Sequence, residues 1–161
     1  MIRHARATDY AAIAEVNDLA FGQSDEARLI ERLREADDVL FELVAEDRGA
    51  IEGHVLFSRL WVDRLELFAA LAPMAVRPER QRGGLGSELV RAGLETARDF
   101  GAHGVLVLGH PAYYPRFGFA AETAARVRSP YAGSPAFMAL ALEPGVFDAP
   151  LTVAYPDAFA G

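Results

Sequence analysis

The sequence contains no cysteine and no lysine, and these two absences narrow the chemistry that the protein can perform. Without cysteine there is no disulfide, no thiolate nucleophile and no zinc–thiolate site. All 16 basic residues are arginine. A phosphate-binding P-loop requires Gly-x-x-x-x-Gly-Lys-Ser/Thr, so the lack of lysine excludes that class of nucleotide-binding protein.

Long apolar runs and an excess of positive charge are also missing. The longest nearly apolar run, residues 67–76, has about half the length of a membrane-spanning helix, and no apolar stretch of a signal peptide follows the N-terminus. The formal net charge is −7, which argues against nucleic-acid binding because such proteins need a basic surface. We therefore expect a cytoplasmic protein that binds neither membranes nor nucleic acids.

Length and composition indicate one globular domain. The chain has 161 residues, of which 52% are hydrophobic and 24% charged, as in an ordinary compact domain. No repeat, low-complexity tract or linker interrupts it, so we expect a single domain over residues 1–161. The charge is uneven, because residues 1–66 hold 15 acidic residues and 8 arginines, whereas residues 67–161 hold 8 of each.

Hydrophobic periodicity predicts an α+β domain with a mixed sheet. Helices are expected over residues 9–21, from residue 25 past residue 33, and over residues 85–100. Strands are expected at residues 2–5, 39–46, 51–62, 65–76, 105–108, 137–142 and 152–155. Short turns between the early strands favour antiparallel pairing, whereas a strand–helix–strand crossover makes the strands at 65–76 and 105–108 parallel. In the second helix the pattern assigns Leu29, Ile30 and Leu33 to the apolar side and Glu26 to the remaining surface.

The most informative segment is a glycine-rich turn between a strand and a helix. Residues 81–87 read Gln-Arg-Gly-Gly-Leu-Gly-Ser and follow the strand that ends at Val76. Glycine lets a backbone approach a ligand closely, and the first turn of a helix offers unpaired N–H groups at the positive end of its dipole. Such a turn could bind phosphate or be a plain structural connection. A dinucleotide-binding fingerprint is excluded because Leu89 stands where it requires a third glycine.

The spacing Gln81-x-x-Gly84-x-Gly86, between a strand and a helix, resembles the pyrophosphate-binding loop of the GNAT-family N-acetyltransferases. The segments similar to the YhbS-type subgroup of this family are 20–22, 26–29, 53–58, 71–76, 108–111 and 113–119. Arg82-Gly83 departs from the more usual Gly-Arg order of the loop. The resemblance implies the GNAT fold, with a mixed, mostly antiparallel sheet of about six or seven strands, a splayed parallel pair and about four helices.

The resemblance also implies where acetyl-CoA, the expected cosubstrate, would bind. The backbone of Met74, Ala75 and Val76 should pair with the pantetheine arm, and His110 should line its channel. The Ala75 N–H should polarise the thioester carbonyl, a type of contact that contributes about 3 kcal/mol to a transition state. The residues expected to hold the pyrophosphate are Gln81, Arg82, Gly83, Gly84, Leu85, Gly86 and Ser87.

Tyr114 stands where the family commonly has a tyrosine that protonates the departing thiolate. The role suits a phenol with a pKa of about 10, because a thiol titrates at about 8.5. The adjacent Tyr113 is the less favoured alternative. No general base is evident, since Asp63 and Glu66 are expected in a solvated hairpin and His54 is expected to be structural.

Taken together, these residues imply an N-acetyltransferase that moves an acetyl group from acetyl-CoA to a primary amine by direct transfer in a ternary complex. The acceptor would be a small molecule or a protein amine; the acidic N-terminal part favours a cation, or only keeps the protein soluble. Three alternatives stay open: a non-catalytic acyl-CoA sensor or interaction module, another acyl donor, and an O-acceptor. Four histidines without ligand spacing predict no metal site. A homodimer is compatible with the sequence but has no direct support in it.

Overall fold

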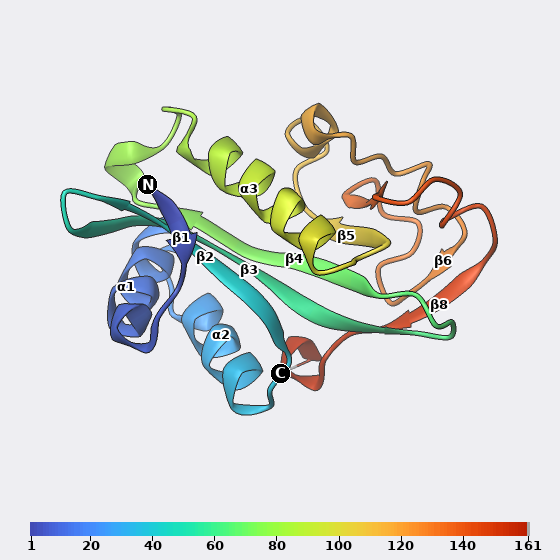
Figure 1. Ribbon diagram of the computed structural model, residues 1–161, viewed down its shortest axis with the longest axis horizontal. Helices are drawn as coiled ribbons and strands as arrows, with labels where there is room; N and C mark the ends of the chain where they lie inside the picture. The colour runs from blue at the N-terminus through green and yellow to red at the C-terminus, as the bar shows by residue number, and fades with distance from the viewer. Residues whose placement is uncertain (161) are drawn as a thin grey trace.

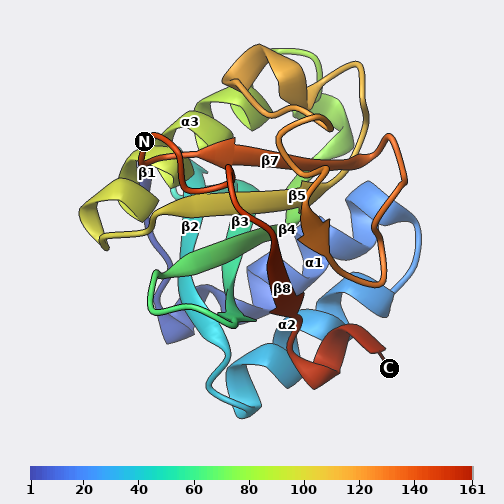
Figure 2. The same ribbon diagram turned by 90° about the vertical axis from the view of Figure 1, so that its right-hand side faces the viewer.

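The structure is a computed structural model that describes residues 1–160. Within them, eight strands form a sheet in the order β1-β2-β3-β4-β5-β7, and β8 pairs with the end of β3 and with β6. The strands are β1 (Ile2–His4), β2 (Val39–Asp47), β3 (Ala50–Val62), β4 (Phe68–Val76), β5 (Gly104–Leu108), β6 (Val127–Arg128), β7 (Phe137–Ala141) and β8 (Leu151–Ala154). The α-helices are α1 (Tyr10–Phe21), α2 (Asp25–Glu35) and α3 (Leu85–Asp99). Figures 1 and 2 show α3 on one face of the sheet, with α1 and α2 on the other.

The pairing of β4 with its two neighbours positions the site. β3 and β4 are antiparallel along most of their length. β4 and β5 are parallel, but their pairing runs only from Phe68 opposite Gly104 to Leu71 opposite Val107. β4 continues to Val76, whereas β5 ends at Leu108. The expected splayed parallel pair is therefore confirmed, and five residues of β4 lack a partner strand on that side.

Each helix buries one apolar stripe against the sheet. In α3 the stripe consists of Leu89, Val90, Leu94 and Ala97, all buried, and burial of a side chain of leucine size stabilises the fold by about 1.5–3 kcal/mol. Gly93 completes this contact, because a Cβ there would overlap the Phe57 ring of β3. On the other face, Ile13 and Val16 of α1 and Ile30 and Leu33 of α2 form a second buried cluster with β2 and β3.

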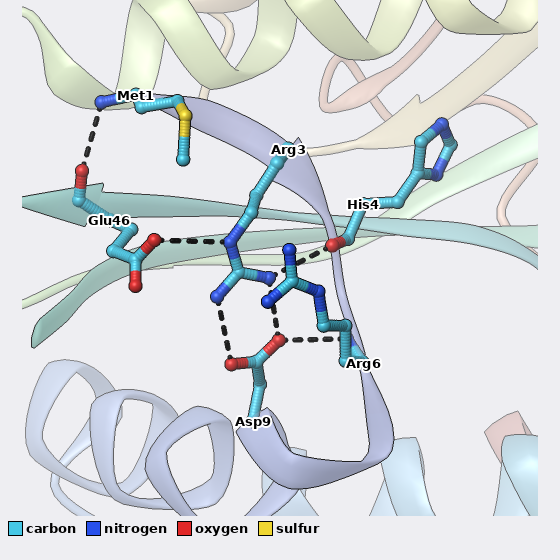
Figure 3. A network of polar contacts seen from close by, with 6 residues as sticks. All are labelled: Met1, Arg3, His4, Arg6, Asp9 and Glu46. Atoms are coloured by element: carbon cyan, nitrogen blue, oxygen red, sulfur yellow. Dashed lines mark hydrogen bonds and ion pairs between the residues drawn. The ribbon is translucent and has the colours of Figure 1, made fainter. Parts of the chain in front are cut away.

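A polar network fixes the N-terminal strand to the start of α1 (Figure 3). The guanidinium of Arg3 donates to both carboxylate oxygens of Asp9, at 2.8 and 3.0 Å, and to Glu46 of β2 at 3.2 Å. The Arg6 N–H donates to Asp9 as well, at 2.7 Å. The hydrogen bond from Arg3 is the main reason that the pKa of Asp9 falls to about 2. β1 is thereby held against β2 although it is only three residues long.

The sequence-based elements agree with the structure except at a few places. β4 begins at Phe68, not at residue 65, because the chain bends where Arg64 pairs with Glu66. Three α-helices form where about four were expected, since the described chain after β5 makes only short 3-10 helices, of which the first is η3 (Tyr114–Phe117). Gly118, with φ of 99°, takes a left-handed conformation that ends η3 after one turn. The two-residue strand β6 was not predicted.

None of the helices in residues 1–160 has the length and apolar character needed to cross a membrane. The remaining short helices are the 3-10 segments η1 (Ala7–Asp9), η2 (Pro78–Arg80) and η4 (Asp157–Ala160).

Candidate active site

A cavity of about 910 Å³ lies where β4 and β5 separate. The predicted site residues that line it are Met74, Ala75, Val76, Gln81, Arg82, Gly84, Gly86, Ser87, His110, Tyr113 and Tyr114. Gly83 and Leu85 belong to the same glycine-rich turn but are not part of the lining. One concave site thus brings together the end of β4, the turn before α3 and the segment after β5.

The glycine-rich turn has two residues with positive φ, the non-glycine Arg82 at 66° and Gly84. Gly84 caps α3 with φ of 89°, a left-handed conformation in which a side chain would be strained. Gly86 lies in the first turn of the helix, and a Cβ there would come 3.4 Å from the Met74 side chain. The unpaired N–H groups at the start of α3 and the residue Arg82 therefore lie at one end of the cavity.

The register of β3 and β4 shows which way the Ala75 amide points. Arg77 donates its N–H to the carbonyl of Glu52 at 2.9 Å, which makes these two residues a hydrogen-bonded pair. Ala75 lies opposite His54, two residues further along in the same register. Hydrogen-bonded and non-hydrogen-bonded pairs alternate in antiparallel sheets, so the N–H and C=O of Ala75 are directed at β3.

The neighbours of Ala75 have their amides on the open side. By the same alternation, the N–H and C=O groups of Met74 and Val76 point away from β3 and toward the gap. The side chain of Gln81 agrees with this, because it donates to the Val76 carbonyl at 3.0 Å. The Ala75 N–H, predicted to contact the thioester, therefore faces the wrong strand for that role, although Ala75 lines the cavity.

Tyr114 and Tyr113 lie in the cavity wall with different surroundings. Tyr114 is buried, and its ring packs over Gly109, where a Cβ would overlap it. Burial, and to a lesser extent Tyr113, raise the pKa of Tyr114 to about 12. Its hydroxyl makes no hydrogen bond to another group of residues 1–160, whereas the Tyr113 hydroxyl lies 3.0 Å from the Ser87 Oγ. Tyr114 thus presents a protonated phenol, and Tyr113 is engaged with the turn.

His54 belongs to a buried polar network outside the cavity lining. Its Nε2 lies 2.9 Å from Glu42, which also accepts two hydrogen bonds from Arg34. Asn17 donates to its Nδ1 at 3.3 Å, so the ring is neutral with the proton on Nε2. Burial lowers the pKa of His54. Burial alone would raise the pKa of Glu42, but the hydrogen bonds from Arg34 and His54 outweigh it and lower that pKa to about 2.

The other candidate bases are also outside the lining. Asp63 accepts the N–H of Thr152 at 3.0 Å, and Glu66 pairs with Arg64 in the turn before β4. The carboxylate that does line the cavity is Glu26, in the first turn of α2, with Gln23 donating to it at 3.2 Å. The hydrophobic pattern had placed Glu26 away from the apolar side of this helix. Helical spacing could have predicted this position, because Glu26 precedes Leu29 by three residues and residues three apart lie on the same side of a helix.

Three aromatic side chains of the C-terminal part were missed as well. The residues are Tyr131 in the loop after β6, Tyr155 directly after β8, and Phe159 in η4. They are separated by up to 28 positions in the chain and carry no motif, so only the fold brings them together. Across residues 1–160, no group of three or more His, Asp or Glu side chains is arranged to hold a metal ion.

Known proteins resemble this chain in sequence and in fold. The profile of the acetyltransferase (GNAT) family covers residues 7–119. The uncharacterized N-acetyltransferase YjhQ of Escherichia coli K12 is 42% identical over 117 residues, which are 70% of this chain and 65% of YjhQ. The uncharacterized N-acetyltransferase YhbS of the same strain is 39% identical over 102 residues, 62% of this chain and 61% of YhbS.

Solved structures extend the likeness to the whole fold. The crystal structure of Escherichia coli YhbS in complex with CoA superimposes with a TM-score of 0.93 at 31% identity, covering 100% of this chain and 92% of that one. A GNAT acetyltransferase from Brucella melitensis in complex with acetyl-CoA gives a TM-score of 0.82 at 34% identity, covering 99% and 97%. The chain belongs to the GNAT acetyltransferase family and has its fold. Its matching part spans less than two thirds of the two curated relatives.

Proposed function

We propose that the protein is an acetyl-CoA-dependent N-acetyltransferase that acetylates a primary amine by direct transfer in a ternary complex. The observation that carries the proposal is the cavity in which the open amides of β4 meet the start of α3. Family membership and the CoA and acetyl-CoA complexes of the two structural neighbours support it. The single domain, the cytoplasmic location and a homodimer stay predictions.

The residues present fit an acyl-CoA. The N–H groups at the start of α3, with Arg82 beside them, would accept the pyrophosphate, because a helix N-terminus combines unpaired donors with a positive dipole end. The open N–H groups of Met74 and Val76 and the open C=O of Met74 would pair with the pantetheine arm as an added strand would. Because Gly86 has no side chain, nothing from this position fills the space next to the Met74 side chain.

Acetyl transfer then gives a role to groups on β4 and to a tyrosine after β5. The acyl-CoA supplies the acetyl group as a thioester. The Met74 N–H, in place of Ala75, would donate to the carbonyl oxygen on which negative charge develops, and Tyr114 would give its phenolic proton to the departing sulfur. Its raised pKa keeps that proton in place at neutral pH. Because the sequence has no cysteine, no cysteine acyl-enzyme is involved.

Two measurements test the proposal. Calorimetry should detect binding of acetyl-CoA and CoA to the purified protein. Release of CoA thiol should then follow addition of acetyl-CoA with a suitable amine, and a thiol reagent reports it without background because the protein has no cysteine. Binding of acetyl-CoA without acetyl transfer to any amine tested would instead favour the acyl-CoA-binding sensor. Absence of binding would exclude both.

A further inference from the structure

The two ends of the cavity differ in charge. Of the described residues that line it, the basic ones are Arg82, Arg116 and His110, and the one acid is Glu26. Arg82 lies in the glycine-rich turn. The Arg116 guanidinium stacks 4.5 Å over the Tyr113 ring, and the hydroxyl of Tyr113 is hydrogen-bonded to Ser87 of that turn. Glu26 lies on α2, on the opposite face of the sheet from α3 (Figure 1). The two arginines therefore lie at the cofactor end, and the carboxylate comes from the helix on the other face.

The wall beside Glu26 is aromatic. Tyr131 and Tyr155 meet edge to face with ring centroids 5.2 Å apart, and Tyr155 meets Phe159 in the same way at 5.5 Å. These three residues are each partly exposed and line the cavity together with Phe21 at the end of α1. η4, which carries Phe159, packs on α2, the helix that carries Glu26, and Figures 1 and 2 show the two side by side.

An aromatic wall with a single carboxylate recognises a particular kind of cation. Ring faces attract an ammonium group and favour an apolar body, while the carboxylate of Glu26 pairs with the charge. Burial, with a smaller effect of Tyr131, raises the pKa of Tyr155, so its phenol stays neutral. Glu26 and the aromatic residues beside it include no basic side chain that could pair with an acceptor carboxylate. A second cationic group on the acceptor would also lack a partner.

We propose that this end of the cavity is an acceptor site for a monocationic primary amine carried on an aromatic or bulky apolar body, with Glu26 holding its ammonium group. The inference rests on the proposed acetyl transfer and names its substrate class. It excludes both α-amino acids, which bring an unpaired carboxylate, and polyamines, which bring a second cation into an apolar wall.

Glu26 also accounts for the proton that an ammonium group must lose. The ammonium group gives up two protons and the sulfur gains one, so each turnover releases one proton to solvent. Glu26 accepts the first proton, the free amine nitrogen forms its bond to the carbonyl carbon, and the carbon–sulfur bond breaks. Tyr114 protonates the sulfur, and the second proton from nitrogen returns to the Tyr114 oxygen through solvent.

The test compares three amines at saturating acetyl-CoA: 2-phenylethylamine, phenylalanine and putrescine. Phenylalanine has the same ring and amine with a carboxylate added, and putrescine has two ammonium groups and no ring. The kcat/KM for 2-phenylethylamine should exceed that of both others about tenfold or more. Equal or faster acetylation of putrescine or phenylalanine would overturn the inference while leaving the proposed transferase activity intact. No acetylation of any amine, or no binding of acetyl-CoA, would instead be a failure of the proposed function.

Variants separate the aromatic wall from the carboxylate. Phe159→Leu and Tyr155→Leu keep an apolar side chain but remove the ring, and each should raise the KM for 2-phenylethylamine about threefold to fivefold with acetyl-CoA affinity unchanged. Glu26→Gln should lower kcat about a hundredfold. Trp61→Ala, an exposed aromatic of β3 outside the cavity lining, is the matched control and should change neither.

A binding measurement gives a readout apart from turnover. Calorimetry of 2-phenylethylamine with the protein–CoA complex should show binding that Glu26→Gln weakens about tenfold and Phe159→Leu weakens less. Equal affinities of the wild type and both variants would place the amine elsewhere and overturn the assignment.

Discussion

Tyr114 is the residue whose chemistry can be isolated most cleanly. Replacement of Tyr114 by phenylalanine removes one hydroxyl that makes no hydrogen bond within residues 1–160 and leaves the packed ring. We expect kcat to fall about a hundredfold, as for loss of a general acid, while the Kd for acetyl-CoA stays within about twofold. Steady-state kinetics measures kcat, and calorimetry on the same preparation measures the Kd for acetyl-CoA.

Tyr113→Phe is the matched control for this experiment. It loses the contact with Ser87 at 3.0 Å, so its effect should appear mainly in acetyl-CoA affinity. A larger loss of kcat in Tyr113→Phe than in Tyr114→Phe would exchange the roles of the two tyrosines.

His54 should make the stability of the protein depend on pH. Because burial lowers its pKa, the folded protein keeps His54 neutral at a pH where the unfolded chain, with a pKa of about 6.5, takes up a proton. The free energy of unfolding should therefore fall as the pH drops below about 6.5, by up to about 1.4 kcal/mol per pH unit. Glu42, whose pKa is lowered to about 2, contributes a further loss only below about pH 4.3.

Urea denaturation at several pH values between 7.5 and 5 checks this, with conditions spaced by about 0.5 pH unit. In His54→Gln the slope below pH 6.5 should be reduced, whatever the variant costs in stability at pH 7.5. An unchanged slope would assign the acid sensitivity to other groups.

At the scale of elements, the end of β5 controls where Tyr114 lies. Gly109 follows β5, and a Cβ added there would overlap the Tyr114 ring. Gly109→Ala should therefore displace the phenol and lower kcat at least about tenfold although every proposed catalytic group is still present. Steady-state kinetics measures the loss. Ala112→Ser, an exposed change in the same loop, should have wild-type kinetics. Wild-type turnover in Gly109→Ala would show that the ring position is not critical.

Local features of the site could be predicted from the sequence, whereas features that depend on strand register or long-range packing could not. The glycine-rich turn was predictable because Gly84 takes a left-handed conformation that favours glycine, directly before a helix. The amide of Ala75 was assigned wrongly, since side-chain patterns do not reveal which pairs of an antiparallel ladder are hydrogen-bonded. That assignment needs the register, which shifts where one extra residue of β4 lies between Leu71 and Met74, opposite Phe57 and Val55 of β3. Tyr155 and its aromatic neighbours depended on long-range packing, which no local pattern encodes.

At the scale of the whole molecule, the uneven charge of the chain has a structural counterpart. Residues 1–66, which carry 15 acidic residues and 8 arginines, form β1 to β3 and the helices α1 and α2 on the proposed acceptor side. The cofactor turn on the other face has Arg82 at the cavity. Opposite charges at the two ends of the cavity would attract an anionic cosubstrate to one end and a cationic acceptor to the other.

If the acidic face attracts a cationic acceptor, added salt should weaken that attraction. Raising the ionic strength from about 20 to about 300 mM shortens the screening length several-fold, so kcat/KM for 2-phenylethylamine should fall about threefold or more. Asp18→Asn with Asp25→Asn removes two exposed acids of α1 and α2 outside the cavity lining. In this double variant kcat should be unchanged and the salt dependence smaller. A salt dependence equal to that of the wild type would mean that the acidic face contributes solubility alone, because acceptor capture would then depend on Glu26 and the aromatic wall at close range.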